Sequence, residues 1–233
     1  MNEPSTVDVS KSKYFLYIAI AFVAILMVSN TTGGKLIGIG PFVFAGAIFI
    51  FPLSYIFGDV MTEVYGYRAT RKIIWSAFVA IIFMSLSYLF IIALPPASFW
   101  AGQEALASTL GLAPRIALAS ILAFFTGEFC NSYILSRMKV WMKGKHLWMR
   151  TIGSTVIGEG VDTVVFVTVA FYGTIPLAVL ILTIWSGYLF KVIYEIIATP
   201  ITYAVVGWLK RAEGIDVYDE GINYNPFHLS EKV

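Results

Sequence analysis

The stretch FPLSYIFGDVMTEVYGY at residues 51–67 decides how this chain folds, because it combines an apolar helical run with two carboxylates. Asp59 and Glu63 are four residues apart, so they share one face of a helix. Pro52 interrupts the same run. A soluble core does not suit such a segment, and in a lipid bilayer the carboxylate face must point away from lipid.

Composition places the rest of the chain in a membrane as well. Hydrophobic residues make up 58% of the 233 positions and charged residues 13%, with a mean hydropathy of +0.80, whereas a soluble domain carries about 25% charged residues. At ~20 residues for each span, we expect an all-α integral membrane protein, a bundle of six transmembrane helices. The net charge of +2 gives no reason to expect a nucleic-acid partner. Cys130 is the sole cysteine, which excludes an intrachain disulfide, and we expect no metal or other cofactor.

The apolar segments and the breaks between them predict the organisation of the chain. We expect an N-terminal segment at 1–13, a transmembrane domain at 14–209 and a tail at 210–233. The six spans are expected at residues 14–32, 41–65, 73–94, 114–137, 148–172 and 176–209. The loop after the third span has the pattern of a short amphipathic helix. The last span would measure about 50 Å against a hydrocarbon core of roughly 30 Å, so it must tilt, kink at Pro200 or project from the membrane.

Basic residues are unevenly distributed between the two sides of the predicted membrane domain. Thirteen of the sixteen Lys and Arg residues lie in the N-terminal segment, the loops after spans two and four, and the tail. Because cytoplasmic loops carry such an excess, both termini are expected in the cytoplasm.

Seven ionisable side chains fall within the predicted spans. They are Asp59, Glu63, Glu128, Glu159, Asp162, Lys191 and Glu195. A charge that faces lipid near the membrane centre costs about 2.5 to 3.5 kcal/mol, so the set would cost on the order of 20 kcal/mol and must face the bundle interior. Their faces can converge on one polar cavity. Six carboxylates against one lysine favour a substrate with hydrogen-bond donors or a positive charge.

Depth along the spans separates a set of charges on the cytoplasmic side. Asp59 and Glu63 lie there, close to several arginines, and we interpret them as part of an inner gate or ion-pair network. This network comprises Asp59, Glu63, Arg68, Arg71 and Arg150. A salt bridge that only fixes helix register is the alternative role for Glu63, and also for Lys191 with Glu195.

The candidate binding site lies nearer the middle of the membrane. Glu159 and Asp162 share one helix face there, and Gly158 leaves space beside them. Pro52 should interrupt the second span and leave the carbonyl of Ile48 without its helical partner. Membrane proteins tolerate such a break beside a polar cavity, and it often marks a transporter site.

Several motifs, in this order along the chain, resemble the queuosine precursor transporter family of the vitamin uptake transporter class. They are Asn30 with Lys35, FPLSYIFGDVMTEVYGYRATRKIIW at 51–75, GSTVIGEGVDTVVF at 153–166 and VYDEGINYNPF at 217–227. The likeness covers nearly the whole chain. It implies a six-helix, multi-pass importer in the bacterial cell inner membrane that carries 7-cyano-7-deazaguanine, with 7-aminomethyl-7-deazaguanine as a second candidate.

The expected chemistry of the residues agrees with such a substrate. Carboxylates can accept hydrogen bonds from the N–H donors of a guanine-like edge, an amide or lysine can donate to its carbonyl, and aromatic rings can stack on its face. The expected substrate-binding residues are Asn30, Lys35, Tyr55, Glu128, Asn131, Ser154, Glu159, Asp162, Phe166, Trp185, Tyr188, Lys191 and Glu195.

Other functions have less support in the sequence. An enzyme is not expected, because His146 and His228 lie outside the spans and no nucleophile-and-base motif is present. The main alternative is a substrate-binding membrane subunit that needs a separate ATP-driven energy-coupling module, since the chain has no Walker motif of its own. The expected partners are a 7-deazaguanine base and the lipid bilayer. A homo-oligomer is compatible with the sequence, which leaves the oligomeric state open.

Overall fold

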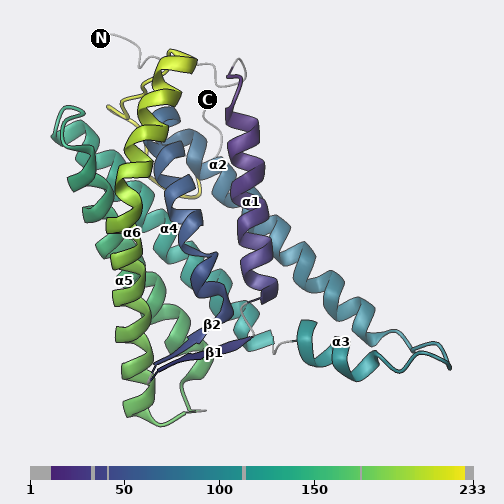
Figure 1. The fold of residues 1–233 in the computed structure, drawn as a ribbon. Helices are drawn as coiled ribbons and strands as arrows, with labels where there is room; N and C mark the ends of the chain where they lie inside the picture. The colour runs from purple at the N-terminus through teal and green to yellow at the C-terminus, as the bar shows by residue number, and fades with distance from the viewer. Residues whose placement is uncertain (1–11, 33–34, 41, 112–113, 174, 229–233) are drawn as a thin grey trace.

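The computed structural model describes residues 12–32, 35–40, 42–111, 114–173 and 175–228, which form a bundle of long helices (Figure 1). In chain order the elements are α1 (Phe15–Thr32), β1 (Leu36–Ile39), β2 (Phe42–Ala45), the 3-10 helix η2 (Gly46–Phe49), α2 (Pro52–Ala93), α3 (Gln103–Leu110), α4 (Pro114–Trp141), α5 (Leu147–Phe171) and α6 (Leu177–Glu213). Five of them, namely α1, α2, α4, α5 and α6, contain a stretch long and apolar enough to cross a membrane. The predicted helical class is confirmed, and the amphipathic pattern after the third predicted span is α3.

Helix α2 contains the stretch at residues 51–67 and is broken in its middle. Gly66 has φ 84° and ψ 167°, which is not helical, so α2 consists of two arms at residues 52–65 and 67–93. Phe15, at the start of α1, has its ring 4.9 Å from that of Tyr65 beside the break, whereas Thr31, near the end of α1, shares a 3.2 Å hydrogen bond with Tyr88 in the second arm. The second arm therefore runs parallel to α1. Figure 1 shows that the two arms meet at the end of the bundle where both termini lie.

The first arm of α2 starts at Pro52, so the prediction that this proline interrupts a longer helix is wrong. Pro52 is in the first turn of α2, where its missing N–H group needs no partner. The preceding residues form η2 and an antiparallel hairpin in which Ile39 pairs with Phe42. An arm of 14 residues rises only about 21 Å, less than the roughly 30 Å of a hydrocarbon core. Strand β2 and η2 occupy the part of the chain that the sequence assigned to the start of the second span.

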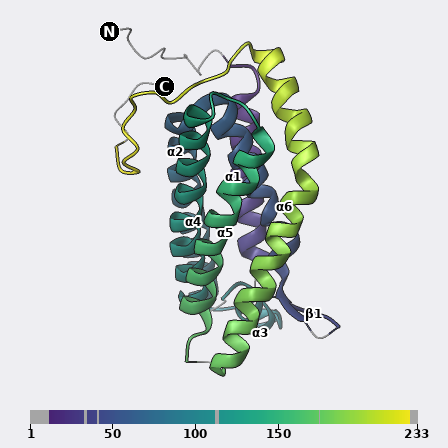
Figure 2. The same ribbon diagram turned by 90° about the vertical axis from the view of Figure 1, so that its left-hand side faces the viewer.

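Helix α6 is a single helix of 37 residues that includes Pro200. It is bowed along the bundle, as Figure 2 shows. The sequence predicted one unusually long segment here, and α6 extends it by four residues to Glu213, after which Gly214 ends the helix in the left-handed conformation. The polar tail begins at that glycine.

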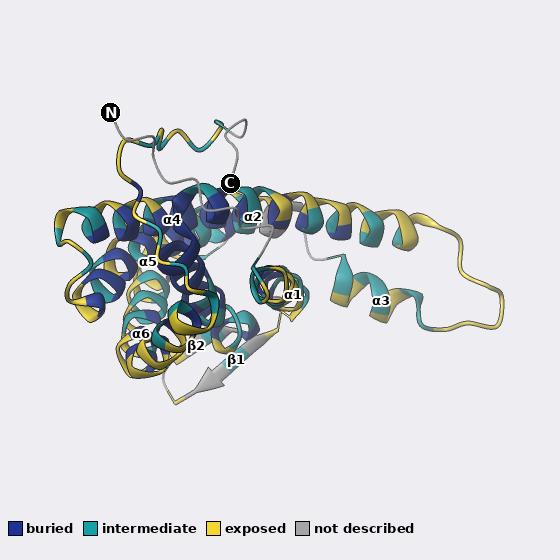
Figure 3. Ribbon diagram, turned by 90° about the horizontal axis from the view of Figure 1, so that it is seen from above, coloured by how far each residue is buried: buried dark blue, intermediate teal, exposed yellow. Residues whose placement is uncertain are grey.

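Apolar side chains cover much of the outside of the bundle. Leu16, Phe83, Phe90 and Ile197 are between 63% and 71% exposed, which suits contact with lipid tails and would be unfavourable in water. Figure 3 shows the buried residues gathered where α2, α4, α5 and α6 face one another, and the second arm of α2 extending away from them with α3. The polar side chains described below lie inside this apolar shell.

Candidate functional site

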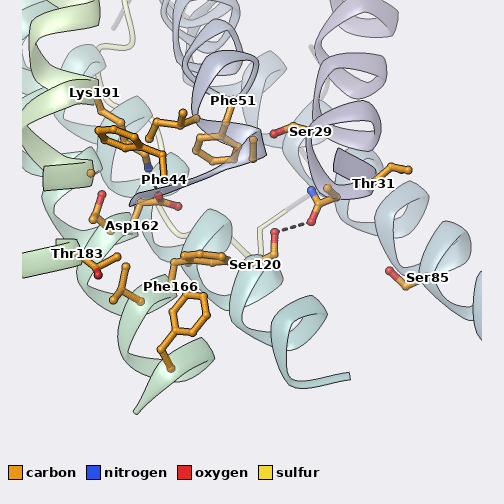
Figure 4. Close-up of a pocket in the computed structure, with 18 of the residues that line it drawn as sticks. Ser29, Thr31, Phe44, Phe51, Ser85, Ser120, Asp162, Phe166, Thr183 and Lys191 are labelled. Carbon is orange, nitrogen blue, oxygen red and sulfur yellow. Dashed lines mark hydrogen bonds and ion pairs between the residues drawn. The ribbon is translucent and has the colours of Figure 1, made fainter. Parts of the chain in front are cut away.

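A cavity of about 330 Å³ lies in the half of the bundle away from the termini (Figure 4). Its lining comes from every long helix and from β2, η2 and α3, and it continues to Phe171 at the end of α5 and to Ile175 beyond it. This volume is at the lower end of the range for small-molecule sites, about 300–1,000 Å³. The volume of the cavity is therefore large enough for a small ring compound.

The floor of the cavity carries a buried cluster of one lysine and two carboxylates. Lys191 Nζ on α6 lies 2.5 Å from Asp162 Oδ2 and 2.8 Å from Glu159 Oε2, both on α5. The two acids reach the same lysine because residues three apart share one face of a helix. The ammonium group also lies 4.7 Å from the ring centre of Phe51 and 5.9 Å from that of Tyr55, a cation–π arrangement. Asp162 and Lys191 line the cavity.

Aromatic and small polar side chains form the walls. Figure 4 shows Phe44, Phe51 and Phe166 lining the cavity together with Asp162 and Lys191. Flat rings beside a charged floor suit a planar aromatic ligand with a polar edge.

Three polar side chains in the walls differ in how far they are already bonded. Ser120 donates a 2.5 Å hydrogen bond to Oδ1 of Asn30. The hydroxyls of Ser29 and Thr163 have no hydrogen-bond partner within the part of the chain that the structure describes. These two hydroxyls are free to bond a ligand.

The structure brings some of the predicted site residues to this cavity. Asn30, Asp162, Phe166 and Lys191 line it, and Glu159 and Tyr55 lie at the lysine just behind the floor. Sequence reasoning missed the cavity-lining residues Ser29, Phe44, Phe51, Ser120 and Thr163. They are ordinary apolar or hydroxyl residues, and some belong to a hairpin that was not predicted. Only the structure, which brings them together around one cavity, identifies them as lining residues.

Other predicted site residues lie elsewhere. Trp185 is 64% exposed on the outside of α6, because it is about 120° around the helix axis from Lys191. Tyr188 donates to the carbonyl of Val156 at 3.2 Å, and the Ser154 hydroxyl donates a hydrogen bond to a carbonyl of its own helix. Lys35 is exposed in the segment before the hairpin. None of these four lines the described cavity.

A second buried polar cluster, deeper than the floor, contains the remaining predicted residues. Asp59 Oδ1 accepts a 2.8 Å hydrogen bond from Asn131, and Glu128 accepts a 3.4 Å bond from Ser132. Glu195 is 2% exposed. The sequence placed Asp59 in the network of the cytoplasmic side, but the structure bonds it to Asn131 inside the bundle.

Two glycines let α4 and α5 approach closely enough to form these clusters. A Cβ atom on Gly127 would lie 2.6 Å from the Cβ of Asp162, and one on Gly158 would lie 2.7 Å from the Cβ of Asn131. Such distances are too short for any larger residue. From the sequence, Gly158 was expected to leave space beside the two acids, and in the structure the neighbouring helix α4 fills that space.

The end of the bundle near the termini holds a third charged cluster, centred on Glu63. Arg150 binds both carboxylate oxygens of Glu63, and Lys210 Nζ lies 2.7 Å from Oε1. Lys139 donates to the main-chain oxygen of Glu63 at 2.6 Å. Asp216 of the tail lies 2.6 Å from Lys139 and 2.9 Å from Lys210. Partial burial raises the pKa of Asp216, but these two lysines outweigh it and hold the pKa below its ordinary value of 3.8.

The tail closes this end over the break in α2. The N–H of Val217 donates to the carbonyl of Val64 at 3.1 Å, and Asp219 accepts bonds of 2.8 Å from the N–H of Tyr67 and 2.5 Å from Ser136. A Cβ on Gly66 would lie 2.7 Å from Val217 and 2.9 Å from the Asp219 carboxylate. Burial raises the pKa of Asp219, although the hydrogen bonds it accepts oppose that shift.

The arginines that follow the break hold the same tail. Arg71 donates to the carbonyls of Asn223 and Asn225 at 2.8 and 2.7 Å, and the charge of Arg68 acts on Asp219. The sequence grouped these arginines with Glu63. The ion-pair partners of Glu63 that the structure describes are Arg150, Lys139 and Lys210, of which the sequence named only the first.

A lipid-facing helical bundle with a charged cavity on one side and a closed charged cluster on the other defines a membrane transporter. The family model described as "Putative vitamin uptake transporter" matches residues 45–205. The chain belongs to this family, which is one of transporters and not of enzymes, and it is a multi-pass protein of the bacterial inner membrane. The family resemblance stated from the motifs is confirmed.

Named relatives cover part of the chain. A protein of Bacillus subtilis (strain 168) named "Probable queuosine precursor transporter" is 33% identical over 156 residues, 66% of this chain and 68% of that protein. The "Queuosine precursor transporter" of Escherichia coli (strain K12) is 27% identical over 126 residues, 53% of each chain. A relative from Haemophilus influenzae, "Probable queuosine precursor transporter", is 28% identical over 123 residues, 52% of this chain and 49% of its own. The match thus spans about half the length of the last two proteins. No solved structure matches the chain.

Proposed function

We propose that the protein imports queuosine precursors, 7-deazaguanine bases such as 7-cyano-7-deazaguanine and 7-aminomethyl-7-deazaguanine, through the cavity. The names of the relatives support the substrate class. The observation that carries the proposal is the floor of the cavity, where Asp162 and Lys191 present an acceptor and a donor side by side below aromatic walls.

The chemistry of a 7-deazaguanine base matches this floor. The base presents N–H donors and a carbonyl oxygen on one edge, so Asp162 accepts from the donors while Lys191 donates to the carbonyl. Phe44 and Phe166 stack on the faces of the ring. When the base binds to Asp162 in place of the lysine, the second acid, Glu159, keeps Lys191 charged. An aminomethyl group, which is a cation, suits the net negative charge of the floor.

The two ends of the bundle fit the two gates of alternating access. The cavity reaches the side of the hairpin and α3, while Arg150, Glu63 and the tail close the side of the termini. With the termini in the cytoplasm, as the distribution of basic residues indicates, this arrangement is open outwards and closed inwards. The two arms of α2 and the four other long helices then make six passes, the first arm of α2 being completed by η2 and the hairpin.

Uptake by the purified protein in liposomes tests the proposal. Labelled 7-cyano-7-deazaguanine should enter the lumen without any other subunit, and Asp162→Asn should reduce uptake at least tenfold because the variant loses the anionic acceptor, a change of more than about 1.4 kcal/mol. Glu104→Gln, which removes an exposed carboxylate on α3, is the matched control and should transport normally.

The same assay separates the proposal from its alternatives. Binding without uptake would point to a subunit that needs an energy-coupling module. Normal uptake by Asp162→Asn would show that this carboxylate is not part of the site. If the wild type neither binds nor takes up the base, the proposed substrate is wrong.

A further inference from the structure

Three buried carboxylates lie beyond the floor of the cavity without a basic partner among the described residues. Asp59 and Glu128 are fully buried, and Glu195 is 2% exposed. The neighbouring lysine, Lys191, is bound to two other acids. Burying an ionised carboxylate without a counter-charge costs many kcal/mol, so such a group takes up a proton instead.

Asp59 is at the centre of this set. One of its oxygens accepts the bond from Asn131, while Oδ2 has no partner in the described part of the chain. The charged side chains with the strongest electrostatic effect on Asp59 are acidic, namely Glu195 on α6, Glu128 on α4 and Glu63 on α2. Of the other helices packed on α2, α1 contains no acidic or basic residue, and α3 packs at Ile92, far from Asp59 along the second arm. Among these strongest contributions, only the hydrogen bond from the amide of Asn131 offsets a negative charge on Asp59.

Unpaired polar atoms beside the carboxylates can hold a mobile proton. The hydroxyl of Tyr55 and Oδ1 of Asn131 are fully buried and lack a hydrogen-bond partner in the described residues, as do Glu128 Oε2 and Glu195 Oε1. Each can bond a protonated carboxyl or a water molecule. A metal ion does not suit the set, because no three His, Cys, Asp or Glu side chains of the described residues are grouped to bind one.

The position of Asp59 links the two gates. Tyr55, Asp59 and Glu63 are spaced by four residues, so they form a stripe on one face of the first arm of α2, with a rise of about 6 Å between neighbours. Tyr55 lies beside Lys191 at the cavity floor, and Glu63 is the centre of the closed cluster. Asp59 lies between these two residues on the same face of the helix.

We propose that Asp59, with Glu128 and Glu195, is a proton-binding site that couples inward proton movement to uptake of the base. A proton binds from the cavity side and leaves to the other side when the Glu63 cluster opens, so no other reactant is consumed. Buried carboxylates serve as proton relays in other membrane transporters. The proposal rests on the proposed function, because it assigns the coupling ion to that transport.

Proteoliposomes that contain a pH-sensitive dye test the coupling in sodium-free buffer. When 7-cyano-7-deazaguanine is added outside, the wild type should acidify the lumen, and an inward proton gradient should drive accumulation of the base at least tenfold above equilibrium. Asp59→Asn, which keeps the shape of the side chain, should lose both effects while it still exchanges internal for external base. Glu104→Gln should behave as the wild type.

Infrared spectroscopy provides a readout that does not depend on transport. The wild type at neutral pH should show the C=O stretching band of a protonated, buried carboxyl group, and Asp59→Asn should weaken it. The proposal is overturned if the variant acidifies the lumen and accumulates base as the wild type does, or if its infrared band is unchanged. A failure of base exchange in the wild type would overturn the proposed substrate, while the infrared band would still decide the proton site.

Discussion

Two charged clusters in this protein are built differently. At the floor of the cavity a single lysine serves two carboxylates, which leaves a formal negative excess next to open space. At the end near the termini three basic side chains meet two carboxylates under the covering tail. The residues of that second cluster are Lys139, Arg150, Lys210, Glu63 and Asp216.

This difference distinguishes a cluster that can bind a ligand, at the floor of the cavity, from a cluster that closes the opposite end of the bundle. The floor keeps acceptor capacity that a ligand can use, whereas the bonding capacity of the Glu63 cluster is taken up by the chain itself. A charge cluster with one cation is also more sensitive to substitution than one with three.

Lys191→Met should have the largest effect, because it removes the only cation of the floor that the structure describes and leaves two buried carboxylates unpaired. Breaking a buried ion pair in this way costs about 3–5 kcal/mol. We expect a loss of that size in the free energy of unfolding, measured in detergent, and no uptake of base. Adding Asp162→Asn should recover part of the stability but no uptake. A Lys191→Met variant as stable as the wild type would contradict this account of the floor.

Gly66→Ala tests whether the tail is packed into the break in α2. The backbone conformation of Gly66, with φ 84° and ψ 167°, costs a non-glycine residue about 1–3 kcal/mol, and the contacts with Val217 and Asp219 should add about 1–3 kcal/mol of overpacking. Gly173→Ala is the matched control, since Gly173 has φ 80° and nothing described within 4 Å of the new methyl group. A larger loss of thermal stability in Gly66→Ala than in Gly173→Ala is the result expected from packing against the tail. Equal losses would show that the tail contributes nothing there.

Arg150→Met should be milder than Lys191→Met, because Glu63 keeps Lys139 and Lys210. Loss of hydrogen bonds to a charged group predicts a decrease of about 1.5–3 kcal/mol in the free energy of unfolding. Lys145→Met, an exposed change of the same charge, should be neutral. If Arg150→Met costs as much as Lys191→Met in the same denaturation assay, the contrast between the two clusters fails.

The smallest effect is on the pH dependence of tail docking. The pKa of Asp216 is lowered in the folded protein, so its contacts with Lys139 and Lys210 contribute stability above the ordinary value of 3.8. This contribution is lost as the pH falls through the lowered pKa. Hydrogen exchange of the Val217 amide should therefore speed up, relative to intrinsic exchange, only below about pH 4, and Asp216→Asn should remove that step.

The sequence predicted the class of fold and the existence of a polar interior because both follow from transfer free energies. Seven ionisable side chains in apolar spans must turn inward whatever their partners are. The same reasoning placed Glu63 and Arg150 near each other at one end, where the structure pairs them. The hairpin at residues 36–45 was missed because the apolar residues of β2 were read as the start of the second span.

Partners within the interior could not be predicted in the same way. The spacing of Lys191 and Glu195 suggested a pair within α6, but the lysine lies on the two acids of α5. Trp185 and Phe166 are equally aromatic in the sequence, yet only Phe166 lines the cavity. Helix rotation decides both outcomes, and it depends on contacts such as the approach of Gly127 to α5.

By itself the sequence determined that this is a helical membrane protein with inward charges, and that the stretch at 51–67 joins the interior to one end. Hydrophobic transfer and helical periodicity are local properties, so they can be read without a structure. Only the tertiary structure decided that Pro52 starts a helix, that Gly66 breaks it under the tail, and that Asp59 faces other acids. These outcomes depend on which helices meet, which is set by the packing of the whole bundle.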